Sequence, residues 1–250
     1  MSVGGAAGGP AADPVAGPIR RLEGACTLAV VADVHLPDVA GTAQEAALAW
    51  AVARMRQEPP DLAIVAGDAT AMGTTDAARR FRALLAAAAV PVLVTPGNSD
   101  RRSPAETAAA LAWLGTEGQA ACPAGIVVLL DSSSGRLPES ERQRLEQIAR
   151  DRPSAPLLLA THSPPERWPA ADREWLSGWM AVMPVDLFVA GHAHVDTIDA
   201  SLGLTGVYHP DGRITFDDKP TKEWEFMATG TGVSGLTVSF PDEMVMQVNH

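Results

Sequence analysis

The stretch AVVADVH, residues 29–35, places a short apolar run directly before a carboxylate and an imidazole. A run of this length, bounded by polar residues, is typical of a buried β-strand. In open α/β sheets the ligand crevice lies outside the carboxyl ends of the strands, so we expect Asp33 and His35 at such a crevice. Carboxylates and imidazoles are common ligands of divalent metals. The stretch therefore predicts an α/β fold with a metal site at the ends of its strands.

Four further apolar runs end in the same way. They are residues 62–66 before Gly67-Asp68, 92–94 before Gly97-Asn98, 157–160 before His162, and 187–190 before Gly191-His192-Ala193-His194. Any one of these short motifs is common as a turn or a loop, because short motifs match by chance. The joint occurrence of all five motifs is far more specific, since four of the six histidines fall inside them. We therefore expect seven ligands to converge on one edge of one sheet, as a two-metal site.

This series of motifs resembles the calcineurin-like metallophosphoesterase superfamily, whose pattern runs D-x-H, G-D, G-N-[H], a lone His and G-H-x-H in that order. The resemblance covers residues 26–195. One position departs from the pattern, because Ser99 stands where the family usually has a His after Gly-Asn. A weaker resemblance, to the cyclic-nucleotide phosphodiesterase-type branch, depends on LDSS at 130–133, a helical pattern over 137–150 and HSPP at 162–165.

The resemblance implies a centre of two divalent or trivalent metal ions, of Mn, Fe or Zn. It assigns Asp33, His35 and His194 to the first metal, Asn98, His162 and His192 to the second, and Asp68 to both. A shared carboxylate suits two-metal hydrolases, whose metals lie about 3.5 to 4 Å apart. Asp68, Asn98 and His162 are accordingly expected to act in catalysis through the metals.

The activity implied by the resemblance is that of a metal-dependent hydrolase acting on phosphoric ester bonds of a phosphorylated small molecule. We expect a phosphodiester to be cleaved by attack of a metal-bound hydroxide. A phosphomonoesterase and a nucleotide pyrophosphohydrolase with the same site are the alternatives. A non-catalytic binding scaffold with a retained metal site is the alternative of another class. All seven ligands are intact, which favours the enzyme.

The substitution at position 99 changes the expected chemistry. A serine hydroxyl cannot protonate a leaving group near neutral pH, but Ser99 is expected to donate a hydrogen bond to the phosphate. Asp100 would be the usual partner of the missing imidazole and is a weaker catalytic candidate. Arg101 is a candidate substrate contact, and the candidates to take over the role of the imidazole are Arg101, His209 and a metal-bound water.

Tryptophans gather just after His162 in the sequence. Trp168 is a candidate wall of the substrate pocket, because it falls in the loop that follows a predicted ligand. Trp175 and Trp179 are four residues apart on a predicted helix and are expected in the core or in an interface. A homodimer contact through this stretch is the other hypothesis.

Composition narrows the class of protein. A net charge of −11 argues against a nucleic-acid partner. No apolar run approaches the roughly 18 residues of a membrane span, so no membrane partner is expected. Residues 1–22 are predicted to be a disordered Gly/Ala/Pro-rich tail without the features of a secretory signal. Two cysteines build no disulfide framework, and a cytoplasmic location is the expectation.

Residues 23–250 are predicted to form one metallophosphoesterase domain, an αββα sandwich of two mixed β-sheets flanked by helices. Apolar spacing predicts helices over 42–57, 76–89, 103–114, 137–150 and 171–182. The third of these should begin with Ser103 as its cap, Pro104 at the first position and Glu106 at the third. Short apolar runs at 225–228, 236–238 and 244–247 are expected to be antiparallel strands of a second sheet.

Overall fold

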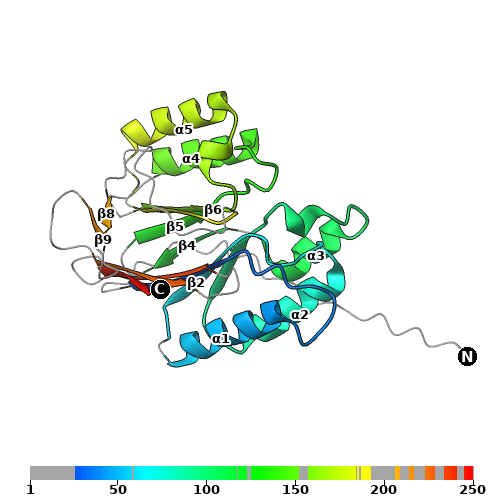
Figure 1. Ribbon diagram of the computed structural model, residues 1–250. Coiled ribbons are helices and arrows are strands. Elements are labelled where there is room, and N and C mark those ends of the chain that lie inside the picture. Colours follow the sequence, from blue (N-terminus) through cyan, green and yellow to red (C-terminus); the bar gives the residue numbers. More distant parts are fainter. Residues whose placement is uncertain are drawn as a thin grey trace, which may run out of the picture.

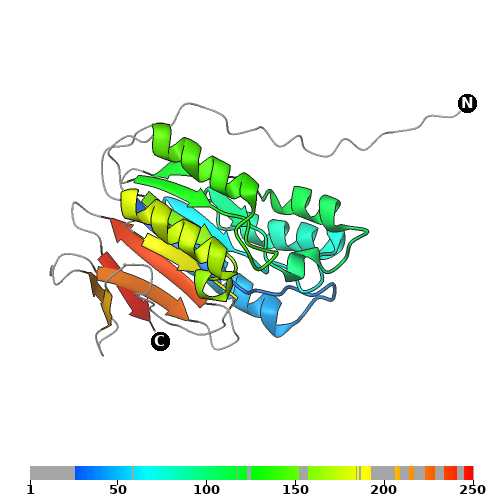
Figure 2. The ribbon, with the colours of Figure 1, turned by 90° about the horizontal axis from the view of Figure 1, so that it is seen from above.

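The computed structural model of the chain describes residues 26–57, 59–116, 118–122, 125–151, 157–183, 185 and 187–192, together with five strands between residues 206 and 249. The predicted tail over residues 1–22 lies outside the described residues, and so do His194, His209 and His250. Figures 1 and 2 show two sheets packed face to face, with α1 and α2 on one outer side and α4 and α5 on the other. The predicted αββα sandwich of two mixed sheets is confirmed.

Strands and helices alternate through the first 190 residues. The elements of the first half are β1 (Cys26–Ala32), α1 (Ala43–Gln57), β2 (Leu62–Ala66), α2 (Thr75–Ala86), β3 (Val92–Thr95), the 3₁₀ helix η1 (Ser99–Arg101) and α3 (Thr107–Leu114). They are followed by β4 (Gln119–Cys122), β5 (Gly125–Leu129), α4 (Glu139–Asp151), β6 (Leu157–Thr161), η2 (Pro165–Arg167), α5 (Ala170–Val182) and β7 (Leu187–Ala190). The last strands are β8 (Gly206–Tyr208), β9 (Ile214–Phe216), β10 (Glu223–Ala228), β11 (Ser234–Phe240) and β12 (Val245–Asn249).

The segments that form each of the two sheets differ from the predicted ones. The first sheet has the order β10-β12-β11-β1-β2-β3 and the second has the order β4-β5-β6-β7. The C-terminal strands were expected to form a second sheet, but they extend the first one, because β11 pairs antiparallel with β1 over its whole length. This pairing covers an edge of β1 that would otherwise carry unpaired backbone N–H and C=O groups. The second sheet is built instead from the middle of the chain.

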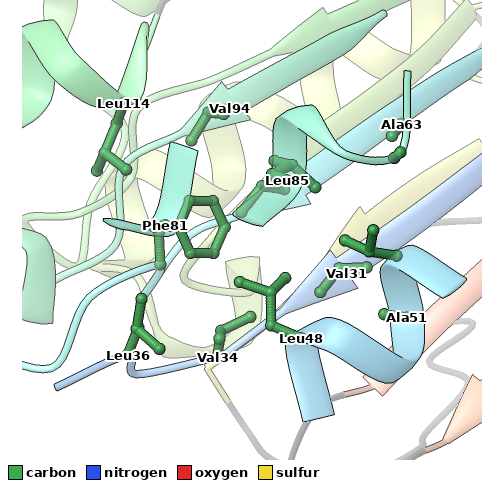
Figure 3. Packing of buried hydrophobic residues seen from close by; sticks show 14 of the residues in the cluster. Val31, Val34, Leu36, Leu48, Ala51, Ala63, Phe81, Leu85, Val94 and Leu114 are labelled. Carbon is green, nitrogen blue, oxygen red and sulfur yellow. The ribbon is translucent and has the colours of Figure 1, made fainter. Parts of the chain in front are cut away.

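The central strands β1, β2 and β6 are almost entirely apolar, and both of their faces are buried over the residues whose burial is described. In β1, Ala29 and Val31 pack toward the helices, in a cluster that includes Leu48 and Phe81 (Figure 3). Leu28 and Val30 point to the opposite face, since side chains alternate along a strand, and they too are buried. This double burial explains why the runs are continuous and do not alternate with polar residues.

Helix starts were predicted well where the capping contacts are local. Thr42 Oγ1 accepts a hydrogen bond from the backbone N–H of Glu45 at the start of α1, and Thr74 caps α2 in the same way at Ala77. The predicted start of α3 at Ser103 is wrong, because this helix begins at Thr107. The carboxylate of Glu106 does not serve its own helix. It accepts from the backbone N–H of Thr75 and so binds the first turn of α2.

Within the described residues, no helix is long and apolar enough to cross a bilayer.

Candidate metal centre

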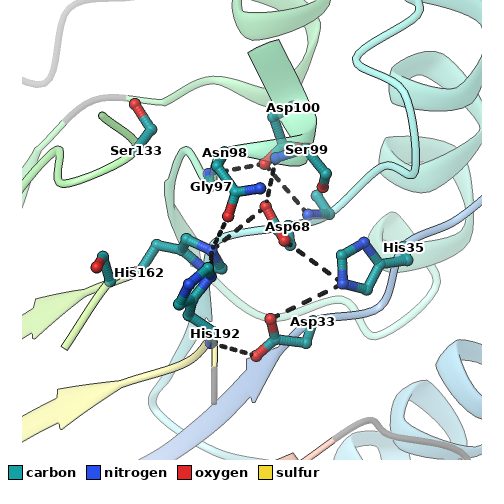
Figure 4. A network of polar contacts seen from close by, with 12 residues as sticks. Asp33, His35, Asp68, Gly97, Asn98, Ser99, Asp100, Ser133, His162 and His192 are labelled. Carbon is teal, nitrogen blue, oxygen red and sulfur yellow. Dashed lines mark hydrogen bonds and ion pairs between the residues drawn. The ribbon is translucent and has the colours of Figure 1, made fainter. Parts of the chain in front are cut away.

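Six of the seven predicted ligands meet at the carboxyl ends of five strands (Figure 4). Asp33 and His35 follow β1, Asp68 follows β2 and Asn98 follows β3, while His162 and His192 follow β6 and β7; His194 lies outside the described residues. The expectation of one edge of one sheet is corrected, because β1, β2 and β3 belong to one sheet and β6 and β7 to the other. The site is therefore formed where the edges of two packed sheets meet.

The two sheets are joined by hydrogen bonds close to this site. Thr95 at the end of β3 donates its hydroxyl hydrogen to the carbonyl of Leu130, just beyond β5, at 2.8 Å. On the ligand side, the ring Nδ1 of His162 lies 3.1 Å from the carbonyl oxygen of Ala66, the last residue of β2. These contacts hold the strand ends of the two sheets together, so ligands as far apart in the sequence as Asp33 and His192 can share one site.

Asp68 lies at the middle of the cluster. Its Oδ2 is 3.4 Å from His35 Nε2, and its Oδ1 is 3.4 Å from His162 Nε2. The carboxylate is buried and held in place, since its Oδ1 also accepts from the backbone N–H of Ser99 at 2.8 Å. Its two oxygens thus face two different imidazoles, those of His35 and His162.

The orientation of the His162 ring is fixed by the backbone of the other sheet. Because a carbonyl can only accept, the 3.1 Å contact with Ala66 requires the proton on Nδ1 and leaves a lone pair on Nε2. That lone pair faces Asn98 Oδ1 at 3.0 Å and His192 Nδ1 at 3.1 Å, besides Asp68. Burial lowers the pKa of His162, opposed in part by the Asp68 carboxylate, and so favours the neutral imidazole that binds metals.

These atoms form two overlapping groups that suit metal ions. Asp68, His162 and His192 each offer a ligand atom within 4.8 Å of the others, and so do Asp33, His35 and Asp68. The carboxylate of Asp68 and the amide oxygen of Asn98 are acceptors, and so is the lone pair of His162 Nε2. Acceptors cannot bond to one another, but a cation placed among these atoms would bind all of them. The donor set of mixed oxygens and imidazoles therefore fits divalent transition metals.

The backbone of the ligands is strained. Asp33, His35, Asp68 and His192 have φ between 48° and 70°, a left-handed conformation that is uncommon for residues other than glycine. Among the described non-glycine residues only Ala89 shares it. Left-handed conformations cost roughly 1–2 kcal/mol per residue and tend to persist at functional sites. Hydrogen bonds support this strain here, for example from the backbone N–H of His192 to Asp33 Oδ2 at 2.8 Å.

Glycines of the motifs leave room for the ligands. A Cβ on Gly97 would lie 2.0 Å from Asp68 Oδ1, and a Cβ on Gly67 would lie 2.4 Å from the Cβ of His162. Gly191 is similarly close to Asp33. The glycine that precedes each of Asp68, Asn98 and His192 is therefore needed because another ligand approaches its backbone.

Ser99 and Asp100 are placed behind the ligands. The hydroxyl of Ser99 is fully buried and donates to the carbonyl of Thr70 at 2.5 Å. The expectation that this hydroxyl binds phosphate is therefore corrected, since its one hydrogen is already used. Asp100 accepts from the backbone N–H groups of Ala69, Thr70 and Gly97, and burial raises its pKa to about 6. Both residues support the loops that carry Asp68 and Asn98.

Trp168 does not line a pocket. Its side chain is 2% exposed and belongs to the core under α4 and α5, where its Nε1 donates to the carbonyl of Ser163 at 2.8 Å. The hypothesis of a pocket wall is therefore wrong, because the loop folds inward after His162. Trp179 is buried in the same core and Trp175 packs against it, as predicted for the core alternative.

The loop after β5 contributes residues that sequence reasoning did not assign to the site. Ser132 Oγ is fully buried and accepts from the backbone N–H of His162 at 3.1 Å and from that of Ser163 at 2.8 Å. Asp131 and Ser133 hold the side chain of Arg101. The signal in the sequence is the LDSS segment at 130–133, which comes directly after an apolar run like those that precede the ligands.

A sandwich of two mixed sheets, with carboxylate and imidazole ligands at its strand ends, defines an α/β metalloenzyme. The chain belongs to the calcineurin-like phosphoesterase family, whose model matches residues 26–196. It is a metal-dependent phosphoester hydrolase. A comparison with curated proteins finds no match.

Solved structures share the fold at low sequence identity. A dimetal phosphatase from Danio rerio is 15% identical with a TM-score of 0.55, over 87% of this chain and 92% of that one. A purple acid phosphatase from yellow lupin (Lupinus luteus) seeds is 12% identical with a TM-score of 0.55, over 90% of this chain and 50% of that one. At these identities the likeness establishes the fold alone.

Proposed function

We propose that this protein is a dinuclear phosphodiesterase in which Asp68 binds both metal ions. The observation that carries the proposal is the position of the Asp68 carboxylate, with Oδ2 toward His35 and Oδ1 toward His162, each at 3.4 Å. Asp33 and His35 would complete one metal site, together with His194 as the family resemblance implies. Asn98, His162 and His192 would complete the other; the full set is Asp33, His35, Asp68, Asn98, His162, His192 and His194. When bound, two such metals bring a water molecule to a pKa near neutrality and neutralise charge on the phosphate.

Hydrogen bonds within the chain hold the metal ligands in position for this reaction. The N–H of Ser99 fixes Asp68, and the carbonyl of Ala66 fixes the ring of His162, so both ligands are held in the form that binds metal. Asp33 positions the backbone of His192. Pre-organised ligands of this kind avoid reorganisation during the reaction, which is a large part of electrostatic catalysis.

The preference for diesters is supported by the LDSS segment at 130–133, which resembles the phosphodiesterase branch. The serine hydroxyl at position 99 is turned to Thr70, so this position offers no proton donor to a leaving group.

The test is a substrate panel with Mn²⁺-loaded protein. We expect bis-p-nitrophenyl phosphate to be hydrolysed with a higher kcat/KM than p-nitrophenyl phosphate or a nucleoside diphosphate. A preference for the monoester would replace the proposal with a phosphomonoesterase, and a preference for the diphosphate would replace it with a pyrophosphohydrolase.

The absence of an imidazole at position 99 also predicts selectivity for good leaving groups. Rates on a series of aryl phosphodiesters should fall steeply as the pKa of the leaving phenol rises, because no side chain at this position protonates the departing oxygen. General acid catalysis is typically worth about 10² to 10⁴-fold, so alkyl esters should be slower by a comparable factor. The measurement is a plot of log kcat/KM against leaving-group pKa.

Ser99→Ala serves as the control, since the hydroxyl of Ser99 is bound to Thr70. It should leave the slope of that plot unchanged. A flat plot for the wild-type protein would mean that another group already supplies the proton.

A further inference from the structure

Arg101 presents a guanidinium group that is held from one side. Its Nε donates to Ser133 Oγ at 2.6 Å, and one of its terminal nitrogens donates to the carboxylate of Asp131. Within the part of the chain that the structure describes, these are its side-chain partners. Arginine has five N–H donors, so three of them remain for a ligand. The side chain is 39% exposed, which leaves it accessible to a small molecule.

Two independent connections tie Arg101 to one half of the metal centre. Its backbone N–H donates to the carbonyl of Asn98 at 3.3 Å, because both lie in the single turn of η1. Its partner Ser133 is next to Ser132, whose hydroxyl binds the backbone of His162. In Figure 4, Ser133 lies on the side of Asn98 and His162 and not on the side of Asp33. The guanidinium group is therefore anchored at the edge of the site formed by Asn98 and His162.

The loop that holds Arg101 is itself rigidly organised. The carboxylate of Asp131 accepts from the backbone N–H of Ser133 at 3.0 Å and from its hydroxyl, so the two partners of Arg101 also bind each other. The Ser133 hydroxyl thus donates to Asp131 while it accepts from Arg101. An arginine held through two of its donors loses little further conformational entropy when the others bind a phosphate.

We propose that Arg101 binds a non-bridging oxygen of the substrate phosphoryl group. It would contact the phosphate on the side where the family usually has an imidazole after Gly-Asn. Asp131 and Ser133 are positioning residues that hold the guanidinium group there. The inference rests on the proposed function and adds a residue that recognises the phosphate itself. Arginine keeps its proton at all relevant pH values, so Arg101 stabilises charge and does not protonate the leaving group. The steep leaving-group dependence predicted above is therefore retained.

The experiment compares Arg101→Gln with Arg102→Gln in Mn²⁺-loaded protein. Arg102 is the matched control, since it is the next residue, is also exposed, and binds the carbonyl of Ala71 through its guanidinium group. Loss of Arg101 should lower kcat/KM for bis-p-nitrophenyl phosphate by about 10- to 100-fold, as expected for a hydrogen bond to a charged group. The dissociation constant of inorganic phosphate, measured by calorimetry, should rise by a similar factor. Metal content should be unchanged, and Arg102→Gln should match the wild type in all three measurements.

Arg101→Lys separates geometry from charge. It keeps the charge but has no planar fork, so it should recover only part of the phosphate affinity. Equal phosphate affinity in wild type and Arg101→Gln would overturn the proposal, as would an equal loss in Arg102→Gln. Because phosphate binding is measured without turnover, wild-type protein that binds phosphate through Arg101 but cleaves no ester would contradict the proposed function alone. Wild-type protein that binds no phosphate would overturn this inference.

The positioning role is tested by a double-mutant cycle. Asp131→Asn should lower kcat/KM by a smaller factor, about two- to fivefold, because a partly exposed ion pair is worth little. In the Arg101→Gln background the same change should have no further effect, since the two residues act as a unit. Stronger phosphate binding in Asp131→Asn would show that Asp131 only neutralises Arg101, and it would overturn the positioning role.

Discussion

Asp68→Asn should remove most of the activity and reduce the metal content below two ions per chain. Both oxygens of Asp68 face imidazoles of the cluster, so a neutral amide weakens both metal sites at once. A metal contributes several kcal/mol of charge stabilisation in the transition state. At about 1.4 kcal/mol per tenfold change, kcat/KM should fall on the order of 10³-fold or more. The measurements are steady-state kinetics and elemental analysis after dialysis.

Asp76→Asn is a suitable control, because Asp76 is an exposed residue in the first turn of α2. It should keep full metal content and activity. An Asp68→Asn variant that retains two metals and normal kcat/KM would show that Asp68 is not shared.

Gly97→Ala should damage stability and the metal centre together. The added Cβ would lie 2.0 Å from Asp68 Oδ1 and 2.2 Å from the backbone nitrogen of Asp68, distances at which something must move. Overpacking of this kind typically costs about 1–3 kcal/mol, and the upper end is expected here because a backbone atom is among those contacted. The variant should melt several degrees below the wild type in calorimetry. It should also lose affinity for Mn²⁺, since Asp68 or Asn98 is displaced.

Gly178→Ala is the matched control for this change. Gly178 lies within α5, where a Cβ would meet nothing within 4 Å, so alanine should stabilise the protein by about 0.5–1 kcal/mol through its higher helix propensity. Metal affinity should be unchanged. If Gly97→Ala and Gly178→Ala behaved alike, the close approach of Asp68 would not be the reason for a glycine at position 97.

The strand ends were predictable because short apolar runs and the residues that follow them are local features. Asp33, Asp68 and Asn98 lie where the sequence puts them, each at the end of a parallel strand of the first sheet. The division into two sheets was not predictable in the same way. Runs that are buried on both faces look alike whichever sheet they join, so the pattern contains no information about strand neighbours.

Errors at single residues have a common physical cause, which is a tertiary contact that overrides a local preference. Glu106 fits a capping box at Ser103 but binds the start of α2 instead. Ser99 follows a ligand in the sequence, yet its side chain turns inward to Thr70. Trp168 also follows a ligand and is buried in the core of the second sheet. In each case the sequence gives the position along the chain correctly, but the direction of the side chain depends on packing.

The role of the loop after β5 could not be predicted for a related reason. Asp131 and Ser133 meet Arg101 only because β3 and β5 lie together where the two sheets pack, as the hydrogen bond between Thr95 and Leu130 shows. Thr95 ends β3 and Leu130 follows β5, which are strands of different sheets, and no motif connects the two residues.

Anomalous X-ray scattering from crystals of Mn²⁺-loaded protein would locate the metal ions and show whether Asp68 joins two of them. Two peaks are expected, one on each side of the Asp68 carboxylate. One peak should be bound by Asp33 and His35, and the other by Asn98, His162 and His192. A single peak, or a second one that Asp68 does not contact, would mean that Asp68 is not a shared ligand.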